Sequence, residues 1–520
     1  MSAGFWRPRH SPWLVALAAT LAPFMEVLDS TIINVSLPHI SGSLSASFDD
    51  ATWSLTSYLV ANGIVLPVAG WLGRLFGRKR YFLACIAMFT VCSFLCGVAA
   101  SLSQLVIFRF LQGLFGGGLQ PNQQAVILDN FEPSQRGRAF SMVAVSVIFA
   151  PILGPLLGGW LTDAYSWRLV FLINVPVGVV AFVAVLRVVE DPPWVARDRA
   201  RATDIDYVGI GLIALGLGCL QVVLDRGEDW DWLSSPLIRL FTMLSLVGIA
   251  GAVAWLLLTD KPVVNLRVLG DRNFGIGVVM VSCIGATLYS SNLLIPAFAQ
   301  RWMGYTALLA GELISPGAVV MIVLVPFVAR VALPNYQTRH VLAFGFFVLG
   351  CAALYAHRLT PDLDFGTIAS WRAFQTVGLA FLFVPNSTIA YSSLPRSMNA
   401  DAAALYAMFR NISGSIGISA AAAITARRLQ VHRAHLAAHL TPLDQNYVDM
   451  LGHAVRVLRA AGQTAGQAEH EAIGLISGVL THQAAVLAYM DAFALSAVGA
   501  FCAIPLTFLF RAGKAGGRGQ

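Results

Sequence analysis

The sequence predicts an all-α integral membrane protein with fourteen transmembrane helices. Hydrophobic residues make up 57% of its 520 positions and charged residues only 12%, and the mean hydropathy is +0.70. A soluble protein carries about a quarter charged residues, so this chain has too few charges to cover a water-exposed surface. Its apolar side chains fit a surface that faces lipid.

Apolar runs long enough to cross a bilayer recur along the whole chain. A spanning helix needs about 20 such residues, and fourteen segments reach that length. They lie near 13–36, 53–73, 81–100, 105–128, 139–162, 168–188, 206–225, 236–258, 274–297, 306–330, 340–357, 367–391, 400–426 and 487–510. The first run is long and contains Glu26 and Asp29, so we interpret it as a retained span and not as a cleaved signal peptide.

Basic residues between the runs test both the number of spans and their orientation. With the N-terminus inside, twenty-one Lys and Arg residues fall on the cytoplasmic side and six fall on the outer side or at adjoining helix ends. The six are Arg168, Arg226, Arg239, Arg301, Arg358 and Arg372. Because positive charge is retained on the cytoplasmic side of a membrane, we expect both termini to be cytoplasmic.

The connection at 427–486 is long, and it lies on the outer side in this topology. Its apolar residues between Tyr447 and Leu458 recur at helical spacing, which predicts one or two amphipathic helices. A tract that contains His432, His435 and His439 could bind a metal. The histidines are loosely spaced and no acidic cluster or cysteine joins them, so a solvated helical face explains them better and we predict no metal site.

Composition excludes several classes of function. The net charge of +7 is spread between apolar runs and forms no basic stripe, so we expect no nucleic-acid binding. The seven cysteines lie inside apolar runs without a CxxC pair, which favours a packing role and predicts no disulfide, metal or other cofactor. The sequence contains no GxxxxGK(S/T) phosphate loop, so an ATP-driven pump would need a separate ATPase subunit.

Three charged residues lie where a bilayer makes charge costly. Glu26 and Asp29 share one face of the first predicted helix, and Arg109 lies in the fourth. Ionisable residues at such depth usually face a cavity or a partner, although a carboxylate can also snorkel to the interface or form an ion pair that serves packing alone. Arginine stays protonated, so a proton-coupled protein would have to use a carboxylate as its switching group.

Glycines mark two further segments. Gly154 and Gly158, with Pro155 and Gly159 beside them, give the fifth predicted helix a face of small residues for close helix packing. A short basic hairpin joins the second and third predicted helices. Its characteristic residues are Gly70, Gly77, Arg78 and Lys79.

Four segments together resemble the major facilitator superfamily, and most closely its fourteen-helix drug:proton antiporters of the EmrB/QacA type. They are LDSTIINVSLP at 28–38, LVIFRFLQG at 105–113, APILGPLLGG at 150–159 and WRLVFLINVP at 167–176. The third segment resembles the motif that distinguishes exporters from importers, and its amino-acid sequence is most similar to that of EmrB-like exporters. The resemblance runs through most of the chain, with its specific motifs concentrated in residues 28–180.

The resemblance implies a major facilitator fold with two six-helix bundles plus two inserted helices, working by alternating access. It also implies the inner membrane of a bacterium. The expected parts are a cytoplasmic N-terminus at 1–12, an N-terminal bundle at 13–190, a linker with the inserted helices at 191–260, a C-terminal bundle at 261–510 and a cytoplasmic tail at 511–520.

The resemblance further implies a proton-coupled multidrug efflux transporter for small lipophilic substrates, with no enzymatic activity. Asp29, Glu26 and Arg109 would couple protons to transport. The candidates for the substrate cavity are Asn34, Gln112 and Glu312. EmrB-like exporters work with a periplasmic adaptor and an outer-membrane channel, so this chain is expected to have partners of that kind.

Several alternatives stay open at the level of the sequence. Glu312 could line the cavity or only mark a helix end. Arg410 lies beside a face of small residues, which favours a structural role for it. The superfamily usually has an acidic residue where Arg74 stands and an arginine where Leu75 stands, so its charge relay at the cytoplasmic gate cannot be carried over. An importer or facilitator of the same fold remains the main alternative function. A membrane-embedded transferase is a more remote alternative.

Overall fold

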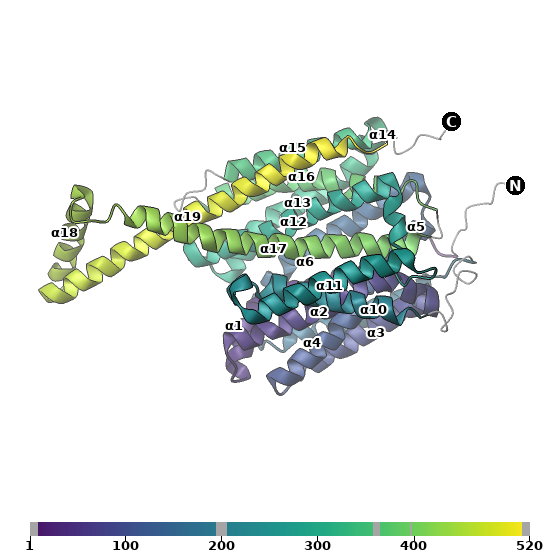
Figure 1. Cartoon of the computed structure of the whole chain (residues 1–520), viewed down its shortest axis with the longest axis horizontal. Coiled ribbons are helices and arrows are strands. Elements are labelled where there is room, and N and C mark those ends of the chain that lie inside the picture. The colour runs from purple at the N-terminus through teal and green to yellow at the C-terminus, as the bar shows by residue number, and fades with distance from the viewer. Residues whose placement is uncertain (1–8, 194–204, 357–363, 396–397, 512–520) are drawn as a thin grey trace.

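The computed structural model describes residues 9–193, 205–356, 364–395 and 398–511, which contain helices and no strand (Figure 1). Twelve helices in this part of the chain are long and apolar enough to cross a membrane. The other two predicted spans form α6 (Pro133–Ala164) and α17 (Asn399–Ala437), with 32 and 39 residues. They pack against α1 and α12 respectively, so the described helices are consistent with fourteen spans.

The first half of the chain forms one group of helices. Its members are α1 (Pro12–Ser43), α2 (Phe48–Phe76), α3 (Arg78–Gly97), α4 (Leu102–Gly116), α5 (Leu119–Asn130), α6, α7 (Leu169–Leu172) and α8 (Asn174–Val188). The hydroxyls of Ser47 and Ser101 accept hydrogen bonds from backbone N–H groups in the first turns of α2 and α4. These caps satisfy donors that have no partner inside the helix.

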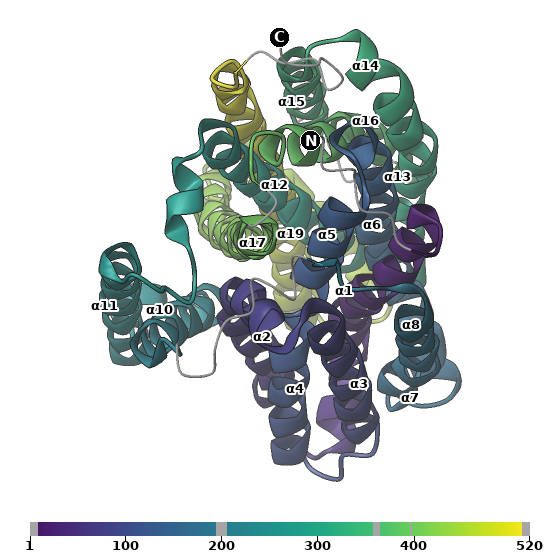
Figure 2. The same ribbon diagram turned by 90° about the vertical axis from the view of Figure 1, so that its right-hand side faces the viewer.

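The second half forms another group, and a hairpin of two inserted helices precedes it. The hairpin is α10 (Tyr207–Arg226) and α11 (Pro236–Leu258), and the group consists of α12 (Arg272–Trp302), α13 (Ala307–Phe327), α14 (Leu333–Asn335), α15 (Thr338–Tyr355), α16 (Phe365–Ala390), α17, α18 (Gln445–Ala460) and α19 (Ala465–Thr507). Figure 2 views the molecule from the end at which α1 begins and α19 ends, which we call the inner end. The inserted hairpin lies beside α2 there, and Gln221 of α10 donates a 3.1 Å hydrogen bond to Ser415 of α17.

The fourth predicted span, near 105–128, consists of two helices. α4 ends at Gly116, and α5 begins at Leu119. A Cβ on Gly117 would lie 2.8 Å from the backbone oxygen of Asn62, and one on Gly118 would lie 2.5 Å from Cys85 Sγ. Glycines are therefore required at this break, because the chain passes very close to α2 and α3.

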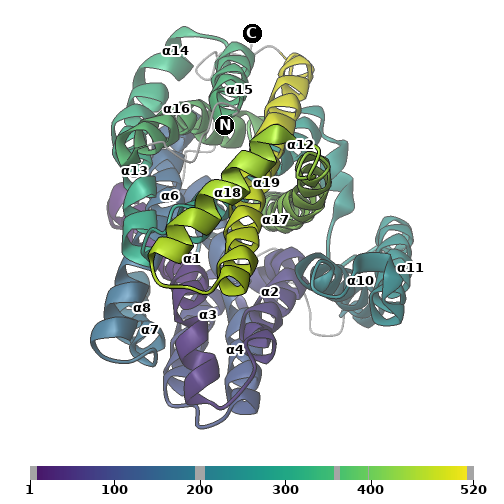
Figure 3. The ribbon, with the colours of Figure 1, turned by 90° about the vertical axis from the view of Figure 1, so that its left-hand side faces the viewer.

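The long connection between the last two predicted spans is mostly helical. α17 continues past the predicted boundary at 426 to Ala437, and α19 begins at Ala465, well before the predicted start at 487. Figure 1 shows α18 and the first turns of α19 projecting beyond the other helices, and in Figure 3, which views the molecule from that end, α18 lies in front of them. We call residues 427–486 the outer hairpin. At its base, Arg428 Nε and His432 Nε2 of α17 lie 2.9 and 2.8 Å from Asp491 Oδ2 of α19.

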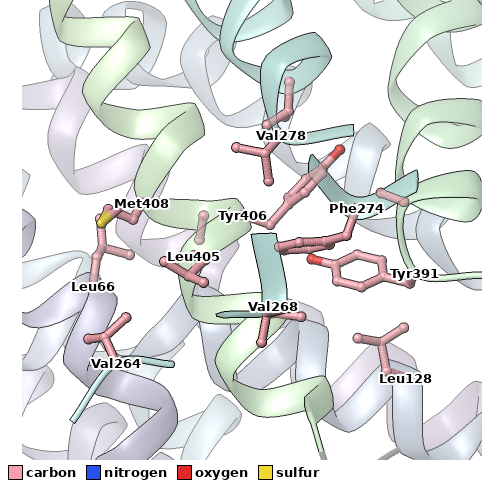
Figure 4. Close-up of a cluster of buried hydrophobic side chains, with 14 of the residues drawn as sticks. Leu66, Leu128, Val264, Val268, Phe274, Val278, Tyr391, Leu405, Tyr406 and Met408 are labelled. Atoms are coloured by element: carbon pink, nitrogen blue, oxygen red, sulfur yellow. The ribbon is translucent and has the colours of Figure 1, made fainter. Parts of the chain in front are cut away.

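An apolar cluster joins the two groups of helices near the inner end (Figure 4). Leu66 and Leu128 belong to the first group, whereas Phe274, Tyr391 and Tyr406 belong to the second. The Tyr391 ring centroid lies 5.9 Å from that of Phe274 and 5.4 Å from that of Tyr406. We call this contact between the groups the inner seam.

Candidate functional site

A buried ion pair links α1 to α4 within the first group. The side chains of Asp29 and Arg109 are 0% exposed, and Arg109 Nη1 lies 2.5 Å from Asp29 Oδ2. Both were singled out in the sequence as charges at membrane depth. The structure brings them into direct contact, which is how a charge becomes tolerable in an apolar interior.

Two amides complete the surroundings of the Asp29 carboxylate. Gln112 Nε2 and Asn174 Nδ2 donate hydrogen bonds of 3.0 and 2.7 Å to Oδ1. Gln112 also accepts a 2.8 Å bond from Arg109 Nη1, and Asn174 donates one of 3.1 Å to Ser93 Oγ. Side chains from α1, α3, α4 and α8 thus meet in one network, which fixes the positions of these four helices relative to the carboxylate.

Arg109 is oriented by α2. Its Nε donates to the backbone oxygen of Ser54 over 3.1 Å, and its guanidinium carbon lies 4.3 Å from the ring centroid of Tyr58. A cation over an aromatic face is an additional stabilising contact. The helices can approach this closely because residue 113 is glycine, since a Cβ there would overlap the backbone oxygen of Tyr58.

Glu26 lies in a different environment, closer to the second group of helices. Its side chain is 3% exposed and accepts a 2.9 Å hydrogen bond from Asn62 Nδ2. Arg410 of α17 acts on it electrostatically and donates a hydrogen bond to Gln120 of α5. Arg410, for which the sequence favoured a structural role, therefore links the two groups beside a buried carboxylate.

The glycines of the exporter-like segment press α6 against α1. A Cβ on Gly154 would overlap Thr31 Oγ1, and one on Gly158 would lie 2.7 Å from the backbone oxygen of Ile32. Gly159 has more space, because the nearest atom to its Cβ position is 3.9 Å away. The side chain of Pro155 lies outside the described part of the structure. The close contact therefore falls two and three residues after Asp29 on α1.

The three candidates for the substrate cavity are not clustered. Gln112 is fully buried in the Asp29 network, whereas Asn34 is exposed on α1. Glu312 is also exposed and lies on the face of α13 that carries Val319 and Val323, which are 63% and 64% exposed. That exposed apolar stripe favours the interpretation of Glu312 as a residue near a helix end on the protein surface.

Charges from both groups meet at the inner seam. Arg74 of α2 pairs with Asp401 of α17, and Arg78 pairs with Asp129 of α5. Asp129 also accepts a 3.2 Å hydrogen bond from Asn399 of α17. The charge relay that is usual in the superfamily could not be carried over to this sequence, because residue 74 is basic. In the structure, Arg74 instead pairs with Asp401 on the opposite group of helices.

The remaining residues of the basic hairpin shape the turn and its attachments. Gly77 has φ +88°, a backbone conformation that favours glycine. A Cβ on Gly70 would lie 2.8 Å from the backbone oxygen of Ala400, so α2 and α17 touch there. Lys79 Nζ donates a 2.7 Å bond to the backbone oxygen of Leu186, which ties the hairpin to the end of α8.

Sequence reasoning missed four residues that the structure places in polar networks. Asn174 lies in a quoted segment but was given no role, and Asp129 and Asp401 were not singled out. Arg372 was assigned to an outer helix end, which is wrong, because it is 2% exposed inside α16. One signal in the sequence could have identified Arg372. A glutamine, Gln375, follows it by three residues, just as Gln112 follows Arg109.

The family follows from comparison with known proteins. The family described as Major Facilitator Superfamily matches residues 19–418. The chain belongs to this superfamily. Multidrug export protein EmrB of Escherichia coli (strain K12) is 35% identical over 485 residues, which cover 93% of this chain and 92% of that protein. A protein of the same name from Haemophilus influenzae is 36% identical over 432 residues, covering 83% and 84%. These relatives place the major facilitator chain in the EmrB-like group.

Solved structures support the same fold. A proton-dependent oligopeptide transporter aligns with a TM-score of 0.58 at 14% identity, covering 96% of this chain and 100% of that one. A bacterial homologue of the lysosomal transporter Spinster aligns with a TM-score of 0.53 at 16% identity, covering 96% and 98%. At such identities the likeness shows the fold alone. The predicted superfamily and all-helical membrane fold are confirmed.

The ion pair at the inner seam predicts a charge-reversal experiment. Arg74→Asp or Asp401→Arg alone places like charges opposite each other and should slow efflux from vesicles. The double variant Arg74→Asp/Asp401→Arg should restore much of the rate, with a coupling free energy of about 1–3 kcal/mol. Arg138 is exposed at the same end of the molecule, so Arg138→Asp should not rescue Asp401→Arg. Equal rescue by both partners would mean that the effect is one of net charge.

The packing of α6 on α1 predicts different effects for two adjacent glycines. Gly158→Ala should destabilise the protein by about 1–3 kcal/mol through overpacking, because the new methyl group meets the Ile32 backbone. Gly159→Ala, with its nearest atom at 3.9 Å, should have little effect. Thermal unfolding of both purified variants in detergent measures the difference, and similar unfolding temperatures would contradict the described contact.

Proposed function

We propose that this protein is a proton-coupled multidrug exporter that works by alternating access in the inner membrane of a bacterium. The observation that carries the proposal is the Asp29 carboxylate, which is fully buried and held by Arg109, Gln112 and Asn174. The relatives named as multidrug export proteins support the direction of transport and the breadth of substrates.

The proton acts on Asp29 in this proposal. Arg109 stays charged throughout the cycle, so its pairing with Asp29 favours the ionised carboxylate while the two residues are in contact. When the helices shift and separate them, the buried carboxylate is favoured in its neutral form. A proton taken up from the outer side in one state is then released to the inner side in the other.

The inner seam supports an assignment of the described state. Apolar contacts and the Arg74–Asp401 ion pair join the two groups at the inner end, where the basic hairpin also lies. The positive-inside rule assigns that end to the cytoplasm. The state is therefore one closed towards the cytoplasm, from which an exporter would release substrate and take up a proton.

The buried carboxylate at position 29 predicts loss of coupling on neutralisation. Asp29→Asn keeps the shape and can still hydrogen-bond, but it cannot cycle between charged and neutral forms. Efflux driven by a proton gradient should fall to background in proteoliposomes, while counterflow without a gradient should persist. A variant that still pumps a dye uphill with unchanged proton stoichiometry would falsify the assignment and direct attention to Glu26.

We further propose that the outer hairpin contacts a periplasmic adaptor, which would in turn connect the exporter to an outer-membrane channel. The hairpin projects beyond the bundle (Figure 1), and several of its apolar side chains are exposed. Leu443, Val457, Leu475 and Val479 are 97%, 55%, 53% and 57% exposed. Apolar residues that are exposed together often mark a protein interface.

The projecting position predicts that the hairpin is dispensable for transport itself. Replacing residues 440–480 by a short Gly-Ser linker keeps the contact of Arg428 and His432 with Asp491. Drug resistance of cells should be lost, whereas proton-driven transport in vesicles should remain. The double variant Leu475→Asp/Val479→Asp should act in the same way without a change of backbone. Loss of transport in vesicles would instead assign the hairpin a role within the transporter.

A further inference from the structure

Arg372 is a buried cation in the second group of helices. It lies on α16, is 2% exposed, and makes no ion pair with any carboxylate of the described residues. Its Nη1 donates to Gln375 Oε1 over 2.5 Å and to Ser291 Oγ over 3.3 Å, and its Nη2 donates to Asn292 Oδ1 over 2.6 Å. Its Nε is buried and has no hydrogen-bond partner among the described residues.

The first group contains the same arrangement with one decisive difference. Arg109 and Gln112 on α4 are spaced like Arg372 and Gln375 on α16, and in each pair the arginine donates to the glutamine three residues later. The next partner comes from α1 in one case and from α12 in the other. It is the carboxylate of Asp29 for Arg109 and the neutral amide of Asn292 for Arg372.

Neutral acceptors leave the charge of Arg372 uncompensated. Hydrogen bonds satisfy individual N–H groups, but a buried charge in an apolar interior also requires an opposite charge. One neighbouring side chain still has a donor that could bind an anion, because Asn292 is only partly buried and its amide nitrogen has no partner among the described residues. On the other side of the guanidinium the packing is close, since a Cβ on Gly317 of α13 would lie 2.6 Å from Thr376 Oγ1 and 3.6 Å from the unpartnered Arg372 Nε.

We propose that Arg372 and Asn292 form a binding site for a monovalent anion, namely a carboxylate of an exported compound or a free chloride ion. The anion accepts hydrogen bonds from Arg372 Nε and from the Asn292 amide, and it supplies the negative charge that Asp29 supplies to Arg109. The chemistry is the same for both sources, and experiments separate them.

Thermal unfolding of the full-length protein in detergent tests the site directly. Sodium chloride, sodium benzoate and sodium gluconate are compared at equal ionic strength, with gluconate as the bulky reference anion. Chloride or benzoate should raise the Tm of the wild type by about 2–4 °C over gluconate. Arg372→Gln, which removes the charge but keeps polar atoms, should lose that increase. Arg239→Gln removes an exposed arginine on α11 and should keep it.

A second variant keeps the test valid if Arg372→Gln does not fold. Asn292→Asp supplies the missing carboxylate from within the protein and recreates the Asp29–Arg109 pair. It should unfold at a higher Tm than the wild type in gluconate and respond no further to chloride or benzoate. The proposal is overturned if the wild type shows no difference between the anions, or if Asn292→Asp responds as strongly as the wild type.

Transport separates the two sources of the anion, and this part rests on the proposed export function. If the occupant is a substrate carboxylate, Arg372→Gln should lower export of the anionic dye fluorescein relative to export of the cationic dye ethidium. If it is chloride, replacing chloride by gluconate should lower export of both dyes by the wild type. A wild type that exports neither dye contradicts the proposed function, whereas the unfolding experiment still decides the anion site.

Discussion

The high cost of an isolated charge in a bilayer is the constraint on which the centre of this molecule depends. Removing one partner from a buried ion pair typically costs about 3–5 kcal/mol, and both Asp29 and Arg109 are 0% exposed. Their contact therefore determines where α1 and α4 can lie. Asn174 and Ser54 extend the network to α8 and α2, so most of the first group is arranged around one carboxylate.

The charges at the inner seam have a different physical character. The side chain of Arg74 is 23% exposed, in contrast to the complete burial of Arg109. An ion pair that solvent can reach is weaker, because water and salt screen it. Such a pair suits the contact that would form and break in the proposed transport cycle. The deeper pair suits the role proposed for Asp29, which would affect the whole bundle.

The sequence predicted the parts of the fold that depend on local composition. The lengths of the apolar runs and the positions of the basic residues predicted the helices. The resemblance of motifs identified Asp29, Arg109 and Gly154 in the first group. Helix ends were predicted less well, because the outer hairpin continues α17 and α19 as amphipathic helix beyond the apolar runs. Gly117 and Gly118 divide a run that we predicted as one span, and only the close approach of α2 and α3 shows why the helix breaks there.

Partners that come from distant segments could not be predicted. Asp401 meets Arg74 across 327 positions of sequence, and no local pattern indicates which acidic residue would face the basic hairpin. Arg372 shows a related difficulty. A charge next to a predicted helix boundary is naturally interpreted as lying at the membrane surface, and only its spacing to Gln375 indicates an interior position like that of Arg109.

The position of α6 explains why the exporter-like segment at 150–159 needs no charged residue of its own. Gly154 and Gly158 bring α6 against Thr31 and Ile32 of α1, directly after Asp29. On another side, α6 packs on α13 and α16 of the second group, where Phe149 meets Ile314 and Ala318. Packed interiors transmit small displacements because they are dense and contain few voids. A movement of the second group against α6 therefore has a short, tightly packed route to the carboxylate, and glycines are needed because any larger side chain would separate α6 from α1.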